Sequence, residues 1–426
     1  MGYTQRMDRT VTEQRIARID SEWVPNTLRV STDLRQAAYV TSAGVGFVVV
    51  LNDTRQERVH DGIGDITFSP DGGRFAYRAQ AGESQFVVID DQEGDRFDGT
   101  GQGSLCFSPD SQRFAYAIMS GSRWSVVVDG QPQGDYDGLA GLIFSPDSQH
   151  VAYRARFGGK EHVVVGGETG EHYDAVRDLV YSPDASRVAY RAQADGRWFI
   201  VVGDRQGKAY DAIQDGSLVF SADGRRLAFV ARTGKASSVV TDGTQSRPYP
   251  TIEGTPVFSP DGKRMAFVAR KARFARLPFL GGPRAVVEDG REGEAAAGIK
   301  QVTFSPDSQH LAYAARHGTQ WSVLLDGEPR AADAGYEDLG DLTFAPAGGP
   351  GGSRLAYGAR SGERYFVVVD GSEGTAYDGV VIGAAGGRIS FQSSHSLRYL
   401  ALKGDDLFAI EETLQDADRT QVRVAV

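Results

Sequence analysis

The chain is built from short apolar runs separated by turn residues, and residues 142–178 show the pattern most completely. Two runs rich in Val, Ile, Phe and Tyr flank a Ser-Pro-Asp-Ser turn, a third follows Gly158-Gly159, and a short fourth contains Tyr173 and Asp174. Runs of this length and composition suit strands, and none is long enough for a typical helix. Pro beside Ser and Asp favours a type I turn. The unit therefore predicts a four-stranded antiparallel meander, with strands A to D from the inside out.

The same unit recurs along almost the whole chain. An aromatic residue precedes the Ser-Pro-Asp turn, or a degenerate version of it, at Phe68, Phe107, Phe144, Tyr181, Phe220, Phe258, Phe304, Phe344 and Phe391, and a weaker copy stands at Val30. A fixed period of about 40 residues with four strands per period is typical of a β-propeller. We therefore expect an all-β protein with about ten four-stranded antiparallel blades.

The repeat resembles that of the WD-repeat-like (TolB-type) β-propeller family. The resemblance is carried by Phe-Ser-Pro-Asp-Gly, followed after three residues by Ala-Tyr or Ala-Phe, as at 68–77 and 258–267. It covers about residues 28–412 and implies the propeller fold. Because this fold hosts many functions, the resemblance says little about what the protein does.

The train of repeats predicts one ring, because no Pro-rich or Ser-rich linker interrupts it. Two five-bladed rings would also fit the count, since propellers typically have about four to eight blades. We divide the chain into an N-terminal segment (1–27), the repeats (28–412) and a C-terminal tail (413–426). Propellers often close when one terminus completes the blade that the other begins, which removes a sheet edge. Residues 15–20 and 421–426 are both candidates for that closing strand, and residues 1–13 are expected to be frayed.

Composition narrows the possible partners and compartments. The chain has 56 acidic and 46 basic residues and a net charge of -10, which argues against a specific nucleic-acid partner. No run approaches a membrane span, and residues 1–26 lack the apolar core of a signal peptide. TolB itself is an envelope protein, so the lack of a signal peptide is a departure from that relative. This lack predicts a cytoplasmic protein. The single cysteine, Cys106, lies in an apolar strand and is expected to be a buried, inert thiol.

No arrangement of residues predicts catalysis. The chain has no Gly-x-Ser-x-Gly elbow, no phosphate-binding Gly-rich loop and no histidine cluster with metal-ligand spacing. The acidic run at 90–98 lacks the spacing of the known calcium loop and is interpreted as a solvated turn. We therefore predict no catalytic residue, metal or cofactor. The alternative is an enzyme, or a propeller that binds a small ligand or carbohydrate, with its site at the central channel.

The repeats also place charge on the two rims of the blades. The A–B and C–D turns share one rim, which is expected to be acidic because it receives Asp71, Asp110, Asp147, Asp184, Asp261, Asp307, Asp129, Asp289, Asp326 and Asp370. The B–C turns and D–A passages share the other rim. That rim is expected to be more basic because it receives Arg156, Arg232, Arg270, Arg316 and Arg360, although Asp178, Asp215 and Asp341 also lie there.

One segment on the second rim departs from the repeat. Residues 270–284 replace a tight B–C turn and contain five basic residues and no acidic one. We predict a loop that docks on a protein partner through Arg270, Lys271, Arg273, Phe274, Arg276 and Phe279, because aromatic and Arg side chains dominate protein interfaces. The alternative is that its apolar residues fold back over the next blade. The predicted function is a non-enzymatic protein-binding scaffold, or a structural subunit of a larger assembly, that docks through the B–C/D–A rim.

Overall fold

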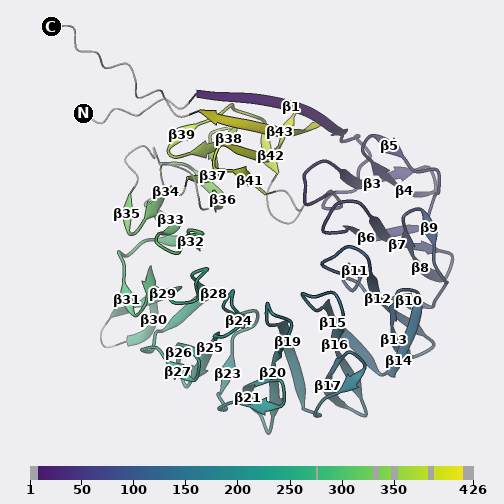
Figure 1. Cartoon of the computed structure of the whole chain (residues 1–426), viewed down its shortest axis with the longest axis horizontal. Coiled ribbons are helices and arrows are strands. Elements are labelled where there is room, and N and C mark those ends of the chain that lie inside the picture. The colour runs from purple at the N-terminus through teal and green to yellow at the C-terminus, as the bar shows by residue number, and fades with distance from the viewer. Residues whose placement is uncertain (1–7, 275–276, 330–334, 347–353, 382–387, 416–426) are drawn as a thin grey trace. The chain divides into compact units, whose positions relative to one another are not determined.

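The computed structural model describes residues 8–274, 277–329, 335–346, 354–381 and 388–415, with the backbone alone over 272–274 and 277–281 and at 381. Every regular element assigned in these ranges is a strand, and the strands form ten antiparallel sheets (Figure 1). Each sheet has four strands, which follow sequence order except in blade 10, where the N-terminal strand β1 is the outer strand. The inner strand of blades 3, 6 and 10 is broken into two pieces. The chain is therefore an all-β, ten-bladed β-propeller, as predicted.

The chain divides into two compact units, and unit 2 (Asp20–Glu292) holds blades 1 to 7, numbered along the chain. Blade 1 has β2 (Arg29–Val30), β3 (Ala37–Ala43), β4 (Gly46–Leu51) and β5 (Thr54–Arg55); blade 2 has β6 (Gly62–Phe68), β7 (Phe75–Ala81), β8 (Ser84–Ile89) and β9 (Gln92–Glu93). Blade 3 has β10 (Gly99–Thr100), β11 (Cys106–Phe107), β12 (Phe114–Ser120), β13 (Arg123–Val128) and β14 (Gln131–Tyr136); blade 4 has β15 (Gly138–Phe144), β16 (Val151–Phe157), β17 (Lys160–Val165) and β18 (Glu168–Thr169). Blade 5 has β19 (Ala175–Tyr181), β20 (Val188–Ala194), β21 (Arg197–Val202) and β22 (Arg205–Gln206); blade 6 has β23 (Ala212–Ile213), β24 (Val219–Phe220), β25 (Leu227–Thr233), β26 (Ala236–Thr241) and β27 (Thr244–Gln245). Blade 7 has β28 (Thr251–Phe258), β29 (Met265–Phe274), β30 (Leu277–Glu288) and β31 (Arg291–Glu292).

Unit 1 (Met1–Ile19 with Gly293–Val426) holds blades 8 to 10. Blade 8 has β32 (Gly298–Phe304), β33 (Leu311–His317), β34 (Gln320–Leu325) and β35 (Glu328–Pro329); blade 9 has β36 (Asp338–Phe344), β37 (Leu355–Ser361), β38 (Arg364–Val369) and β39 (Ser372–Glu373). Blade 10 has β40 (Gly379–Val381), β41 (Ser390–Ser393), β42 (Ser396–Lys403), β43 (Asp406–Gln415) and β1 (Asp8–Arg18).

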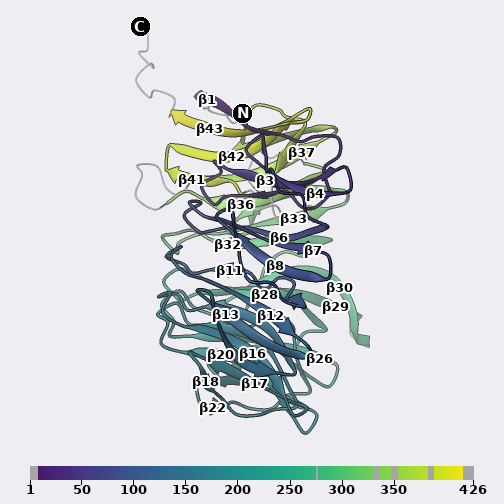
Figure 2. The ribbon, with the colours of Figure 1, turned by 90° about the vertical axis from the view of Figure 1, so that its right-hand side faces the viewer.

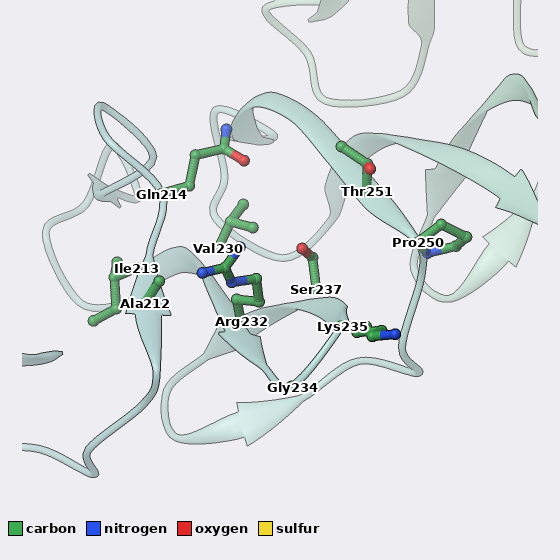
Figure 3. Close-up of a pocket in the computed structure, with 10 residues that line it drawn as sticks. All are labelled: Ala212, Ile213, Gln214, Val230, Arg232, Gly234, Lys235, Ser237, Pro250 and Thr251. Atoms are coloured by element: carbon green, nitrogen blue, oxygen red, sulfur yellow. The ribbon is translucent and has the colours of Figure 1, made fainter. Parts of the chain in front are cut away.

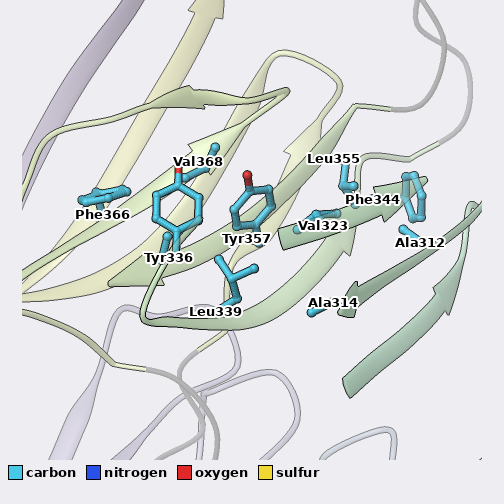
Figure 4. Close-up of a cluster of buried hydrophobic side chains, with 11 residues drawn as sticks. Ala312, Ala314, Val323, Tyr336, Leu339, Phe344, Leu355, Tyr357, Phe366 and Val368 are labelled. Carbon is cyan, nitrogen blue, oxygen red and sulfur yellow. The ribbon is translucent and has the colours of Figure 1, made fainter. Parts of the chain in front are cut away.

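The hydrophobic core consists of layers between successive blades. Ala189 and Ile200 of blade 5 pack against Phe229 of blade 6, and Val230 of blade 6 packs in turn against Phe267 of blade 7. Figure 4 shows the same arrangement in unit 1, where strands β33 and β34 of blade 8 contribute to one cluster with blade 9. The cluster contains Ala312, Ala314 and Val323 of blade 8 and Leu339, Phe344, Leu355 and Tyr357 of blade 9. Face-to-face burial of this kind lets each sheet cover its neighbour. Since packing continues across blades 5, 6 and 7 within one unit, the alternative of two five-bladed rings is wrong.

The N-terminal strand completes blade 10. β1 pairs with β43 in antiparallel register from Asp8↔Gln415 to Arg18↔Asp406, with a bulge between Arg15 and Ala17. This strand begins at Asp8, within the range 1–13 that was expected to be frayed, and not at residue 15. It is largely polar and only Ile16 and Ala17 are buried, so hydrophobicity alone does not mark its start. Residues 421–426, the other closing candidate, lie outside the described residues.

A buried ion pair holds β1 to its blade. Arg9 Nη1 lies 2.8 Å from Glu412 Oε2, and the two side chains are only 7% and 0% exposed. Tyr399 Oη donates a hydrogen bond to the other oxygen, Glu412 Oε1, at 2.6 Å. Arg9 also donates to the backbone oxygen of Val367 at 3.2 Å. Removing one partner of such a pair is costly because it leaves the other charge buried and uncompensated.

We expect Arg9→Ala to lower the free energy of unfolding by about 3–5 kcal/mol, because Glu412 would then be a buried, unpaired carboxylate. Urea unfolding followed by circular dichroism measures this change. Arg15→Ala is the matched control on the same strand: its pair with Asp406 is 48% and 36% exposed, so it should cost below about 1 kcal/mol. Equal losses in the two variants would contradict the role given to the buried pair.

Candidate interaction surface

The A–B turns, which form the first rim together with the C–D turns, are closed by a repeated hydrogen-bond pattern. In blade 2, Ser69 Oγ donates to Asp71 Oδ1 at 2.6 Å and accepts from Arg74 N at 2.8 Å. The same Ser-to-Asp bond is present at Ser31, Ser108, Ser145, Ser182, Ser221, Ser259 and Ser305. The weak copy at Val30 therefore keeps the turn chemistry although it lacks Pro. These Asp side chains are engaged inside the turn, in the manner of an Asx-turn.

The C–D turns on the same rim are tied to the next blade by arginine. Arg74 Nε donates to Asp90 Oδ2 at 2.8 Å, and its Nη1 donates to the backbone oxygen of Gln112, in blade 3, at 2.9 Å. Its guanidinium also lies 5.1 Å from the ring centre of Phe107. We call this arrangement the inter-blade arginine clamp. Arg113 and Arg226 repeat it with Asp129 and Asp242.

The clamp revises the expectation of an acidic rim. Asp90, Asp129 and Asp242 are paired with arginines that the sequence pattern did not assign to them, because strands B and C separate the two residues in the chain. Charges paired in this way act locally and contribute less to the field of the whole rim. The first rim is thus used mainly to join successive blades.

The hydroxyl of Ser182, with that of Ser186, lowers the pKa of Asp184 to about 2. In the unfolded chain the pKa of an aspartate carboxyl group is about 3.9. The folded state is therefore stabilised fully above about pH 4, and this contribution is lost as the pH falls towards 2.

Ser182→Ala should flatten the decline of stability between pH 5 and pH 2.5, measured by urea unfolding. Ser125→Ala, whose hydroxyl donates to the Gly134 carbonyl, should keep the wild-type pH profile. A Ser182→Ala profile parallel to wild type would contradict this account.

The segment predicted as a loop on the second rim is a β-hairpin. β29 and β30 stay paired through Arg270↔Arg284, Ala272↔Gly281 and Phe274↔Leu277, with bulges that absorb the unequal spacing. Figure 2 shows the two strands running on together beyond the other strands of their blade. The segment 270–284 is therefore a paired hairpin and not the loop that was expected. Gly281, Gly282 and Pro283 lie inside β30.

The six predicted docking residues are placed only in part. Arg270 Nε lies 2.5 Å from Glu253 Oε1, and Lys271 Nζ lies 3.5 Å from Glu292 Oε2. The side chains of Arg273, Phe274, Arg276 and Phe279 lie outside the described residues. Burial would raise the pKa of Glu253, but hydrogen bonds from Arg284 and Arg270 hold it below its usual range. Acids from β28 and β31 thus offset part of the positive charge that the sequence assigns to this hairpin.

The strongly exposed large apolar side chains among the described residues also lie on the second rim. Val45, in the B–C turn of blade 1, is 101% exposed, and Val59, in the D–A passage of that blade, is 53% exposed. Phe157, at the B–C turn of blade 4, is 53% exposed. Sequence analysis did not single out these residues, because a lone Val or Phe near a turn is indistinguishable from one that folds inwards.

Part of the second rim is architectural. Asp137 Oδ2, from a Tyr-Asp pair in a D–A passage, accepts a hydrogen bond from Gly158 N in the next B–C turn at 2.8 Å. The same bond is made by Asp61, Asp98, Asp174, Asp211 and Asp378. These carboxylates brace each B–C turn against the passage from the previous blade. They therefore serve the architecture of the blades.

A cavity of about 560 Å³ opens on the second rim between blades 6 and 7. It is lined by Ala212, Ile213, Gln214, Val230, Arg232, Gly234, Lys235, Ser237, Pro250 and Thr251 (Figure 3). Its lining contains two basic side chains and no acidic one. Sequence analysis placed Arg232 on this rim but did not predict a cavity.

The structure offers little for catalysis by metal or thiol. Within the ranges that the structure describes, no group of three or more His, Cys, Asp or Glu side chains is placed to hold a metal ion. Burial raises the pKa of Cys106 to about 12, and its Sγ lies 3.7 Å from the backbone oxygen of Ala115. Such a thiol stays protonated at neutral pH and is a poor nucleophile. No helix among the described residues is long and apolar enough to cross a membrane.

Comparisons with known proteins give neither a family nor a function. No family model and no curated protein matches the chain. A eukaryotic initiation factor of known crystal structure has 15% sequence identity to this chain, and the match covers 74% of this chain and 89% of that protein's chain with a TM-score of 0.45. TolB from Acinetobacter baumannii is 13% identical over 71% of this chain and 78% of its own, with a TM-score of 0.29. The β-propeller domain of the trilobed protease from Pyrococcus furiosus is 12% identical over 74% and 94%, with a TM-score of 0.32. Likeness at this level carries no argument about activity.

Proposed function

We propose that this protein is a non-enzymatic protein-binding scaffold, or a structural subunit of a larger assembly, that docks through its B–C/D–A rim. The observation that carries the proposal is the difference between the rims of unit 2. The first rim is occupied by turn and inter-blade hydrogen bonds, whereas the second bears the extended β29–β30 hairpin and the exposed Val45, Val59 and Phe157. Exposed apolar side chains framed by polar ones are typical of interaction surfaces.

The hairpin is the proposed anchor of the contact. Phe274 and Phe279 would supply its desolvated centre, with Arg273 and Arg276 around them, since aromatic and Arg residues most often dominate binding energy. Arg270 and Lys271, paired with Glu253 and Glu292, would support the base of the hairpin rather than meet the partner directly. The membership of the repeats in the TolB-type family and a cytoplasmic location stay predictions from the sequence.

The hairpin test uses a variant with Phe274→Ser, Phe279→Ser, Arg273→Glu and Arg276→Glu. If the tip docks a partner, the melting temperature should stay close to wild type while the co-purifying host protein is lost. Affinity purification from host extract with mass spectrometry, together with thermal unfolding, measures both. The matched control places Arg225→Glu and Lys263→Glu on the opposite rim, where both side chains are more than 80% exposed, and should retain the partner.

Two results would count against the hairpin as a docking element. Unfolding of the hairpin variant would show that its tip packs within the propeller. A stable variant that keeps every co-purifying protein would show that docking takes place elsewhere. The wild-type interaction should also weaken at high salt if the arginines contribute, because salt screens exposed charges.

A further inference from the structure

The cavity between blades 6 and 7 exists because one repeat position carries an unusually small side chain. The residue that opens strand C is aromatic at Phe47, Trp124, Trp198, Trp321 and Tyr365. By the same register, blade 6 has Ser237, which pairs with Arg232 across the B–C hairpin. Serine leaves unfilled most of the volume that an indole ring occupies in blade 5.

Two other blades show what that position does when it is polar. Gln85 Oε1, in blade 2, accepts a hydrogen bond from Thr100 N of blade 3 at 2.9 Å. Glu161 Oε2, in blade 4, accepts one from Val176 N of blade 5 at 2.7 Å. The chain itself therefore places a carboxylate in this gap between blades. In blade 7 the counterpart of Val176 is Ile252, which Ser237 is too short to reach.

The charge around the empty position favours an anion. Among the described residues, the guanidinium of Arg232 makes no hydrogen bond or ion pair. Other arginines at its position are engaged: Arg156 donates to the backbone oxygen of Asp137 at 3.2 Å, and Arg360 lies 3.3 Å from Glu337. Figure 3 shows Arg232 beside Val230 and Ser237 within the cavity. A guanidinium is well matched to a planar carboxylate.

The remaining walls can orient the rest of a ligand. Gln214 uses its Nε2 to donate to the backbone oxygen of Gly254 at 2.9 Å, so its Oε1 is the group left to accept from a ligand. Figure 3 places Gln214 and Thr251 on the side of the cavity opposite Gly234. Glu253, the nearest acid along β28, is already shared by Arg270 and Arg284. The site therefore combines a cation with a hydrogen-bond acceptor and hydroxyl groups.

We propose that this cavity is a binding site for a carboxylate, which takes the place between blades 6 and 7 that Glu161 fills between blades 4 and 5, with Arg232 as its cation where Glu161 has Arg177. The carboxylate belongs either to a free hydroxy acid or to an acidic side chain of a docked protein. The chemistry at Arg232 is the same for both sources. The proposal stands apart from docking by the β29–β30 hairpin, since it rests on different residues.

Isothermal titration calorimetry on the full chain tests the site with two probes at constant ionic strength. The probes are sodium gluconate and an acetylated, amidated tetraglutamate peptide, and neutral sorbitol is the control ligand. We expect saturable binding of at least one anionic probe and none of sorbitol. Arg232→Ala should weaken that binding by at least about tenfold, because hydrogen bonds to charged groups are the strong ones.

Ser237→Trp is a sharper variant because another blade of the chain already has tryptophan at this position. Trp198 occupies this position in blade 5, where Ala175 is the counterpart of Ala212, so the substitution should fold and fill the cavity. It should abolish binding without lowering the melting temperature. If it does not fold, Ser237→Gln reproduces the side chain of Gln85 and serves the same purpose. Arg156→Ala removes an arginine from the same repeat position in blade 4 and should leave binding unchanged.

Each outcome decides the proposal. Binding of gluconate alone supports a free hydroxy acid, and binding of the peptide alone supports an acidic side chain of a partner protein. Absence of saturable binding for both probes would overturn the site. So would binding that survives Arg232→Ala and the filled cavity, because the anion would then be held elsewhere. Retention or loss of the hairpin's partner does not enter this measurement.

Discussion

The inter-blade arginine clamp of blades 2, 3 and 6 is the directional contact that holds successive blades of the seven-bladed unit in register. One guanidinium, such as that of Arg113, bonds the C–D turn of its own blade, reaches the turn carbonyls of the next blade and covers the aromatic residue of that blade. Layers of Val and Ala between sheets are non-directional, so they favour stacking without fixing its register. Directional bonds to backbone carbonyls supply that register from blade 2 to 3, from blade 3 to 4 and from blade 6 to 7. His310 keeps part of this contact by pairing with Asp326 at 2.7 Å, whereas blade 4 has His150 and Gly166 in place of arginine and aspartate.

Use of one rim for joining blades leaves the other rim able to vary. The second rim has its own braces, the aspartates that hold each B–C turn, but these fix only the base of a turn. Beyond that base the chain carries a long hairpin in blade 7, exposed Val45 and Phe157, and a cavity created by one serine. Binding residues are commonly found on such connections held by a rigid scaffold.

The repeat made the fold predictable, while contacts between distant segments limited what could be said of the site. Each Ser-Pro-Asp turn is local, so the blades and their order follow from the sequence. The closing strand was placed too late because its partner, β43, lies at the opposite end of the chain. The segment 270–284 was interpreted as an unpaired basic loop because Glu253 and Glu292, which pair with Arg270 and Lys271, lie on other strands. Ser237 stands at a repeat position that is aromatic in five other blades, but only strand register shows that it faces a gap.

The central claim is that the two rims have different tasks, one joining the blades and the other meeting partners. Hydrogen exchange with mass spectrometry, on the chain alone and on the chain purified with its bound host proteins, tests it most directly. The account predicts that bound protein slows exchange in peptides from β29–β30 and the B–C turns, while the Ser-Pro-Asp turns exchange at the same rate in both samples. Protection confined to the Ser-Pro-Asp turns would contradict it.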